Sequence, residues 1–259
     1  MPAATVMEDH EQTDSPLSPV ANPAFGMPSP AAPCPPKRPE DIHRIVETVD
    51  RYNPQNIPVL ETYVEDMLQN DAYDRDACLA VLKLYQFNPT YSNTAIVCNI
   101  LALALCALPD PDFNLCLYML NEGVLNEPDV DALVQLHRLL EQAKFVEFWT
   151  YLNGGESPAK ELVAPYEHFE KRIRDYVSVT LGIAYQVIDK ASLGRSLNLQ
   201  GAALDKWIAE KGWTADANGD AKLVAFPITA ENQVRPAVLQ ESIKFEHLTK
   251  IIGYGRLNQ

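Results

Sequence analysis

The chain has 259 residues, of which 47% are hydrophobic and 22% are charged, and 35 acidic against 21 basic side chains give a formal net charge of −14. This length and hydrophobic content suffice for one large or two modest domains with a real core, which excludes a globally disordered chain. The acidic balance disfavours a protein that coats nucleic acid, because affinity for phosphates comes largely from Lys and Arg.

The negative charge is concentrated in the middle of the chain. Residues 38–164 hold eight basic and 20 acidic side chains, whereas residues 165–259 hold 12 basic and 11 acidic ones. The cysteines are odd in number, show no Cys-x-x-Cys spacing and, with the exception of the first, fall in apolar helical patterns: Cys34, Cys78, Cys98, Cys106 and Cys116. This usage predicts buried free thiols in a reducing compartment.

The N-terminal segment, residues 1–38, is rich in Pro, Ala and Ser and shows neither helical nor strand periodicity. This composition predicts a disordered tail, and a flexible end is expected for residues 253–259. No basic stretch followed by an apolar core begins the chain, so no signal peptide is expected. The longest apolar run, residues 95–108, is too short to cross a bilayer and predicts a core helix. We therefore expect a cytoplasmic protein.

The same helix-stop signal occurs twice in the next part of the chain. Tyr52-Asn53-Pro54 and Phe87-Asn88-Pro89 lie 35 residues apart, which is the length of a helix-turn-helix repeat. Asn before Pro is pushed out of the α region, so each signal ends a helix. The helix over 74–87, with Asp74 as its N-cap, is apolar on nearly every side and is therefore predicted to be covered all round.

Helical periodicity begins at Pro39, after which Ile42, Ile45, Val46 and Val49 form one apolar stripe. Further helices are predicted near residues 56–69, 74–87, 91–108, 111–121, 128–142 and 143–152. Short-linked helices of this kind predict a helical-repeat domain, HEAT- or TPR-like, over residues 39–164.

The pattern changes after Pro165. A long helix is predicted from Tyr166 to Ile188, with Tyr176, Ala184 and Val187 on its buried face. Helices over 191–197 and 201–211 follow, and then a hairpin that turns at Asn218-Gly219 into a strand over 222–226. Three helices and a hairpin in this order predict a winged-helix domain over residues 165–252. The whole chain is predicted to be mostly α.

The sequence contains no phosphate-binding loop, no dinucleotide fingerprint, no His-Glu-x-x-His and no nucleophile elbow. Acidic pairs such as Glu65-Asp66 or Asp110 with Asp112 are interpreted as helix-start residues that favour the helix dipole rather than as metal ligands. His137 is interpreted as a surface or boundary residue beside the stripe of its helix. We therefore predict neither an enzyme nor a bound metal or cofactor.

Two groups of residues are candidate binding sites. The basic cluster Lys171, Arg172 and Arg174 could contact RNA phosphates, although a solvated helix face explains it as well. The run Leu223, Val224, Ala225 and Phe226 stops at Pro227, which suits a strand at or near a sheet edge that pairs with a partner protein. The alternative is that this strand is covered internally and that a partner docks on the acidic helical face.

Several longer sequence segments resemble one protein family. Residues 50–54 (DRYNP), 79–89 (LAVLKLYQFNP) and 182–189 (GIAYQVID), together with Lys206-Trp207 and residues 212–216 (GWTAD), closely resemble subunit K of eukaryotic translation initiation factor 3. The similarity extends over residues 40–252 and leaves residues 1–38 without a counterpart. A stacked-helix module followed by a winged helix is also the layout of PCI-type scaffold subunits in the proteasome lid and the signalosome.

The resemblance implies a non-catalytic scaffold subunit of the multi-subunit initiation factor. Such a subunit supports recruitment of initiator tRNA and messenger RNA to the small ribosomal subunit. The resemblance also implies subunit L as the direct neighbour, no membrane contact and, at most, weak direct binding to nucleic acid. It carries no catalytic residues with it.

Overall fold

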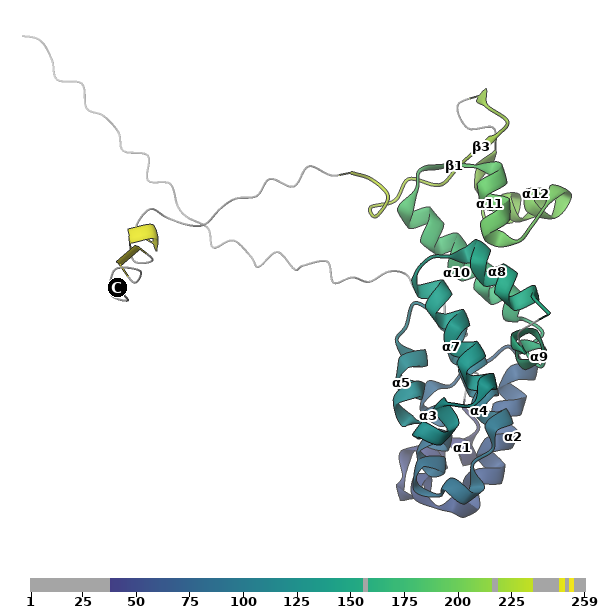
Figure 1. Ribbon diagram of the computed structural model, residues 1–259, viewed down its shortest axis with the longest axis vertical. Helices are drawn as coiled ribbons and strands as arrows, with labels where there is room; N and C mark the ends of the chain where they lie inside the picture. Colours follow the sequence, from purple (N-terminus) through teal and green to yellow (C-terminus); the bar gives the residue numbers. More distant parts are fainter. Residues whose placement is uncertain (1–37, 156–157, 216–218, 235–246, 250–251, 254–259) are drawn as a thin grey trace, which may run out of the picture.

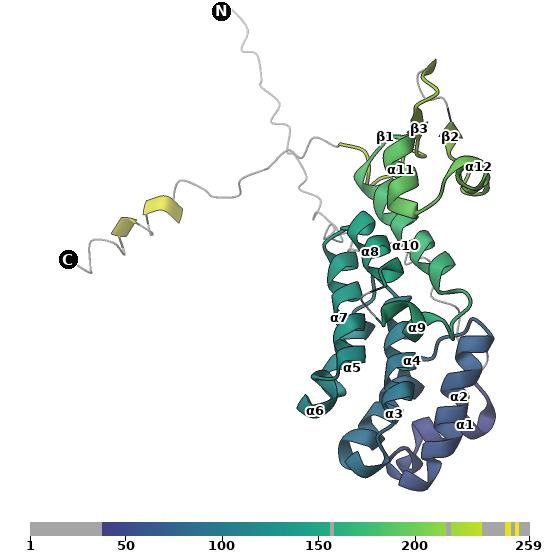
Figure 2. The same cartoon turned by 45° about the vertical axis from the view of Figure 1, so that its right-hand side comes forward.

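The computed structural model describes residues 38–155, 158–215, 219–234, 247–249 and 252–253. The predicted tail, apart from Arg38, and the predicted flexible end beyond residue 253 lie outside these ranges. The described helices and strands form an elongated body with α1–α3 at one end and a small sheet with α11 and α12 at the other (Figures 1 and 2). No helix in the described ranges is long and apolar enough to span a membrane.

The first part of the chain is a stack of helices, as predicted. Its members are α1 Glu40–Glu47, α2 Ile57–Gln69, α3 Arg75–Phe87, α4 Thr94–Leu105, α5 Asp112–Met119, α6 Glu122–Leu125, α7 Pro128–Glu141, α8 Phe145–Asn153 and α9 Ala159–Val163. Short 3-10 turns stand between some of them: η1 Val49–Tyr52, η2 Pro54–Asn56 and η3 Pro89–Tyr91. The mostly helical fold class is therefore confirmed.

Local chemistry explains where these helices begin. The Asp74 carboxylate accepts a hydrogen bond from the Ala77 backbone N–H at 3.2 Å, which confirms the predicted N-cap of α3. Asn93 caps α4 in the same way through Ala95, at 3.1 Å. Helix α4 is apolar on nearly all sides and lies largely buried among α2, α5 and α7, which accounts for its mostly hydrophobic sequence.

Two details of the predicted stripes are wrong. Val49 is 82% exposed, because α1 ends at Glu47 and the chain turns into η1 before the stripe is complete. Phe87 is 57% exposed, although most of α3 is buried as predicted. Phe87 is the last residue of α3, and its ring contacts Tyr52 and Lys83.

The second part of the chain follows the winged-helix order. It contains α10 Phe169–Ala184, β1 Val187–Asp189, α11 Lys190–Leu197, α12 Gly201–Glu210, β2 Thr214–Ala215 and β3 Leu223–Ala225. The three strands form an antiparallel sheet in the order β1-β3-β2. Pairing of β2 with β3 confirms the predicted hairpin, although part of its turn, residues 216–218, lies outside the described residues.

The prediction that the long helix continues to Ile188 is wrong. Helix α10 ends at Ala184, and the next residues form β1, which leaves Ala184 and Val187 exposed rather than buried. The Phe226 N–H donates to the Gln186 carbonyl at 2.9 Å, and the Lys190 N–H donates to the Lys222 carbonyl at 2.7 Å. These ladder bonds to β3 replace the helical bonds, which the apolar pattern alone does not reveal.

Candidate partner-docking surfaces

The predicted edge strand lies in the middle of the sheet. Strand β3 is bonded to β1 on one side and to β2 on the other, so its backbone groups are used within the chain. Val224 is fully buried, and Phe226 is buried with its ring against Trp213, at 4.7 Å between ring centroids. The prediction that Leu223, Val224, Ala225 and Phe226 lie at the edge itself is therefore wrong, because β3 is paired on both sides within the described sheet.

Strand β1, which follows helix α10, is an outer strand of the sheet, and the backbone on its far side from β3 has no partner strand in the described sheet. Val187 pairs with Ala225 and Ile188 pairs with Val224. Because the ladder bonds involve Gln186 and Lys190, the alternate residues Val187 and Asp189 direct their backbone N–H and C=O groups toward the outer edge. Tyr185 is 49% exposed and Val187 38% exposed beside this edge. An apolar strand edge of this kind is a template for another strand. The sequence did not predict strand β1, because the apolar residues at 184 and 187 continue the helical pattern of α10.

The basic cluster on α10 is largely used inside the chain. Arg172 donates two hydrogen bonds to the Asp71 carboxylate, from Nε at 3.0 Å and from Nη2 at 2.8 Å, and the Tyr166 hydroxyl donates a third at 2.5 Å. Asp71 follows the C-cap of α2, Asn70, and has a left-handed φ of 51°. Burial alone raises the pKa of Asp71, but the three donors outweigh it and lower the pKa below its usual value.

Arg174 is also engaged within the chain. Its Nε donates to the Leu197 carbonyl at 3.0 Å, Nη2 pairs with Glu170 at 2.7 Å, and the guanidinium lies 5.1 Å from the centre of the Trp149 ring. Lys171, by contrast, is exposed. Two of the three predicted RNA-contact residues therefore tie the second part of the chain to the first, and they do not form a continuous basic surface for phosphates.

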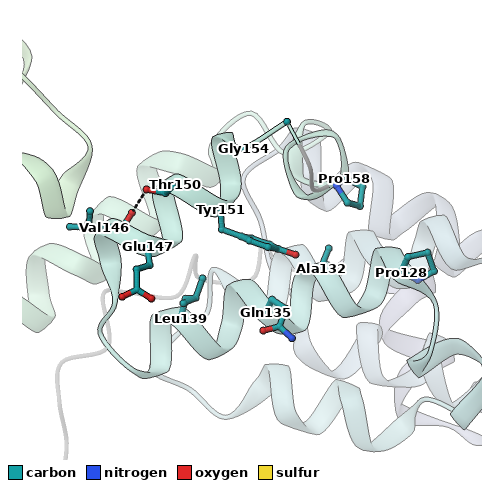
Figure 3. Close-up of a pocket in the computed structure, with 11 residues that line it drawn as sticks. Pro128, Ala132, Gln135, Leu139, Val146, Glu147, Thr150, Tyr151, Gly154 and Pro158 are labelled. Carbon is teal, nitrogen blue, oxygen red and sulfur yellow. Dashed lines mark hydrogen bonds between the residues drawn. The ribbon is translucent and has the colours of Figure 1, made fainter.

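A groove of about 860 Å³ runs between α7 and α8 (Figure 3). A tight turn between these helices sets their spacing: the Lys144 N–H donates to the Leu139 carbonyl at 2.9 Å, and Ala143 has a φ of 54°. This is the Schellman arrangement, in which the left-handed position usually holds Gly. The turn brings both helices to the same groove, with Pro128, Ala132, Gln135 and Leu139 on α7 facing Val146, Glu147, Thr150 and Tyr151 on α8.

The lining of this groove suits docking rather than chemistry. The ring of Tyr151 lies across it toward Ala132, and Val146, 48% exposed, adds apolar surface at its end (Figure 3). Glu147 lies 3.8 Å from Lys144, and the Thr150 hydroxyl donates to the Val146 carbonyl at 2.9 Å. The groove therefore offers an apolar floor, and two of its polar side chains, Glu147 and Thr150, already have partners within α8 and the turn before it.

The titratable groups that the sequence singled out have structural neighbours. His137 is buried, stacks on Phe113 at 4.1 Å between ring centroids, and has a pKa lowered by burial, which Glu141 only partly offsets. Its predicted surface or boundary position is therefore wrong. Asp112 lies in the first turn of α5, as expected, but its carboxylate is buried and accepts a hydrogen bond from the Tyr73 hydroxyl at 3.0 Å.

Other acidic side chains and the cysteines also have structural positions. Glu65 and Asp66 lie in the C-terminal half of α2, so their predicted place at a helix start is wrong. The described cysteines are free thiols, and burial raises the pKa values of Cys98 and Cys116 to about 12. Within the described ranges, no group of three or more His, Cys, Asp or Glu side chains could hold a metal ion.

Comparison with known proteins gives consistent matches over most of the chain. A family model described as the CSN8/PSMD8/EIF3K family matches residues 91–236. The protein named eukaryotic translation initiation factor 3 subunit K from Nematostella vectensis is 34% identical over 216 residues, which are 83% of this chain and 96% of that relative. The protein of the same name from Homo sapiens is 35% identical over 214 residues, which are 82% of this chain and 94% of that relative. The relative from Cryptococcus neoformans var. neoformans is 34% identical over 235 residues, 85% and 92% of the chains.

Proposed function

The chain belongs to the family of eukaryotic translation initiation factor 3 subunit K, and we propose that it acts as a non-catalytic scaffold subunit of the initiation factor 3 complex. The observation that carries this proposal is the extent of the similarity, which covers 94–96% of the animal relatives and therefore nearly their whole length. As part of the complex, the chain supports recruitment of initiator tRNA and messenger RNA to the small ribosomal subunit in the cytoplasm.

The architecture supports a scaffold role. A helical-repeat domain over residues 39–164 and a winged-helix domain over residues 165–252 give an elongated chain with several separate docking surfaces. Repeat domains bind partners over extended surfaces rather than in a single deep pocket. The shallow groove between α7 and α8 and the open edge of β1 are surfaces of this type.

The direct neighbour proposed for this chain is subunit L, through the outer edge of β1. The apolar side chains of Tyr185 and Val187 beside that edge would be covered by a partner strand, and the outward N–H and C=O of Val187 would gain hydrogen bonds. The even balance of 12 basic and 11 acidic side chains in residues 165–259 removes electrostatic opposition to such contact.

A pair of substitutions tests this contact. Val187→Pro removes a backbone donor at the outer edge and leaves the ladder bonds of Gln186 and Lys190 to β3 in place. Val187→Ala is the matched control, since it shortens the same side chain and keeps the donor. We expect the proline variant to co-purify with less subunit L than the alanine variant, with an unchanged far-UV helical signal. Equal recovery of subunit L by both variants would contradict docking at β1 and favour the acidic helical face.

The second candidate function is that of a PCI-type scaffold subunit in a proteasome-lid or signalosome-like complex. The description of the matching family model, CSN8/PSMD8/EIF3K, is the observation that favours it. Mass spectrometry of the proteins that co-purify with the tagged chain decides between the two. Recovery of initiation factor 3 subunits supports the first proposal, and recovery of lid or signalosome subunits in their place refutes it.

A further inference from the structure

Two exposed aromatic rings stand side by side where successive helical repeats end. The rings of Tyr52 and Phe87 lie 6.1 Å apart between centroids, and the two residues are 52% and 57% exposed. Each precedes one of the two Asn-Pro stop signals, so the 35-residue repeat brings equivalent positions together. Val49, 82% exposed, lies three residues before Tyr52 in η1, and i and i+3 share a face in a 3-10 helix. We call Val49, Tyr52 and Phe87 the aromatic ledge.

Cationic side chains flank this ledge. The Arg51 guanidinium lies 5.7 Å from the centre of the Tyr52 ring, and the Lys83 ammonium lies 4.7 Å from the centre of the Phe87 ring. These contacts help to hold the rings in place, but they leave more than half of each residue exposed. Aromatic rings presented in this way are the recognised partners of extended proline-rich segments, which bind at low entropic cost because proline pre-forms the extended helix.

The chain enters the described structure about one helix length from the ledge. The guanidinium of Arg38 donates to the buried carboxylate of Asp74, with 2.7 Å between Nη2 and Oδ1, and pairs with Glu47 at 3.0 Å. Asp74 caps the N-terminus of α3, whereas Phe87 ends the same helix. The length of α3 therefore separates the entry point from the ledge by about 20 Å. An extended proline-rich chain rises about 3.1 Å per residue, so roughly seven residues cover this distance.

The residues before Arg38 have the composition that this span requires. Residues 28–36 read PSPAAPCPP, with five prolines in nine positions. We propose that this proline-rich segment of the chain docks on the aromatic ledge, with Pro30 and Pro33 against the rings of Tyr52 and Phe87. A span of roughly seven residues back from Arg38 reaches this Pro-Ala-Ala-Pro stretch. The short tether gives the segment an effective concentration on the order of millimolar, so a contact that is weak between separate molecules is populated within one chain.

The test uses one reporter thiol in the full-length chain. Ala31→Cys combined with Cys34→Ser places a single tail thiol between Pro30 and Pro33, whereas Cys78, Cys98 and Cys116 are buried. The rate at which N-ethylmaleimide alkylates this thiol is measured by mass spectrometry of the tail peptide. Docking shields the thiol, so we expect Tyr52→Ala with Phe87→Ala to raise the alkylation rate about two- to tenfold.

Two further measurements separate docking from general effects. Tyr118→Ala is the matched control, because Tyr118 is an exposed tyrosine, 79% accessible, on α5 and outside the ledge; it should leave the alkylation rate unchanged. An excess of a free peptide of residues 28–36, with Ser at position 34, should raise the rate in the reporter chain but not in the ledge variant. Equal rates with and without the ledge overturn the proposal, as does an equal increase in the Tyr118 variant or no response to the peptide.

Discussion

Loss of the ion pair between Arg172 and Asp71 is expected to destabilise the whole fold, because it joins the loop after α2 to α10. Arg172→Met keeps a flexible, unbranched apolar stem, although a shorter one, and removes two charge-assisted hydrogen bonds to Asp71. Such bonds contribute about 1.5–3 kcal/mol each when buried, and exposed ion pairs about 0–1 kcal/mol. The two side chains are 21% and 31% exposed, so solvent screening reduces the total to about 2 kcal/mol.

The assay is thermal unfolding followed by circular dichroism at neutral pH. For a chain of this size, about 2 kcal/mol lowers Tm by roughly 4–8 °C. Lys171→Met is the matched control, since Lys171 is the exposed neighbour on the same helix, and its Tm should stay within about 1 °C of the parent. Equal Tm values for the two variants, with RNA affinity reduced only by Arg172→Met, would refute the structural role and restore Arg172 as an RNA contact.

The pH dependence of this pair has a definite sign. The pKa of Asp71 is lower in the folded chain than its ordinary value of 3.8, because the donors Arg172 and Tyr166 outweigh the opposing effect of burial. A carboxylate with a lowered folded pKa contributes stability that is present above the unfolded pKa and lost as the pH falls through the folded one. The Tm difference between the parent and Arg172→Met should therefore be constant from pH 7 to about pH 5 and shrink below about pH 4.

Three further changes test the core and its turns. Leu82→Asp buries an unpaired charge at a fully inaccessible position and should cost several kcal/mol, so a soluble, fully helical variant would contradict the buried position. Ala143→Gly relieves the left-handed backbone and should raise Tm by about 2 °C, whereas Gln142→Gly, one residue earlier at a φ of −83°, should lower it. Tyr73→Phe should cost about 2 kcal/mol at neutral pH, measured by urea unfolding.

Features that depend on neighbouring residues could be predicted from the sequence. The N-cap at Asp74 and the stop at Asn88-Pro89 follow from local backbone chemistry, and the structure agrees with both. At Asn53-Pro54 only the 3-10 turn η1 ends, because α1 has already ended at Glu47. The hairpin at Asn218-Gly219 is local in the same sense, because its two strands are close in the sequence, with β2 ending at Ala215 and β3 beginning at Leu223. Hydrophobic periodicity was sufficient for the stack of helices, since each helix buries one stripe or, for α4, most of its surface.

Features that depend on distant residues could not be predicted in this way. Arg172 and Asp71 are 101 residues apart, and nothing near Arg172 in the sequence distinguishes a basic side chain with a partner from one that faces solvent. The error at β1 has the same origin. Residues 185–188 fit a helical pattern, and only pairing with β3 across 38 residues, Val187 with Ala225, makes them a strand. Without β1, the sequence predicts a two-stranded hairpin in which β3 has a free edge.

The cost of Tyr73→Phe in stability depends on pH, and this dependence shows whether the Asp112 carboxyl group is charged or neutral in the core. The Tyr73 hydroxyl donates to Oδ2 of Asp112, whereas Oδ1 has no hydrogen-bond partner in the described part of the chain and Arg75 lies 3.8 Å away. Burial raises the pKa of Asp112 above 3.8, so the folded state binds this proton more readily than the unfolded state, and stability falls as the pH rises through the raised value. Removal of the hydroxyl raises the folded pKa further.

The cost of Tyr73→Phe should therefore be largest at neutral pH, where the Asp112 carboxylate is charged, and should shrink as the pH falls toward 4 and the group gains its proton. Tyr63→Phe is the matched control, because the Tyr63 hydroxyl lies 3.5 Å from Asp74, a carboxylate that Arg38 already pairs. It should cost less than about 0.5 kcal/mol. A cost of Tyr73→Phe that is the same at pH 4 and pH 7 would mean that the hydroxyl bonds a carboxyl group that is already neutral, and that Asp112 keeps its proton in the folded core at neutral pH.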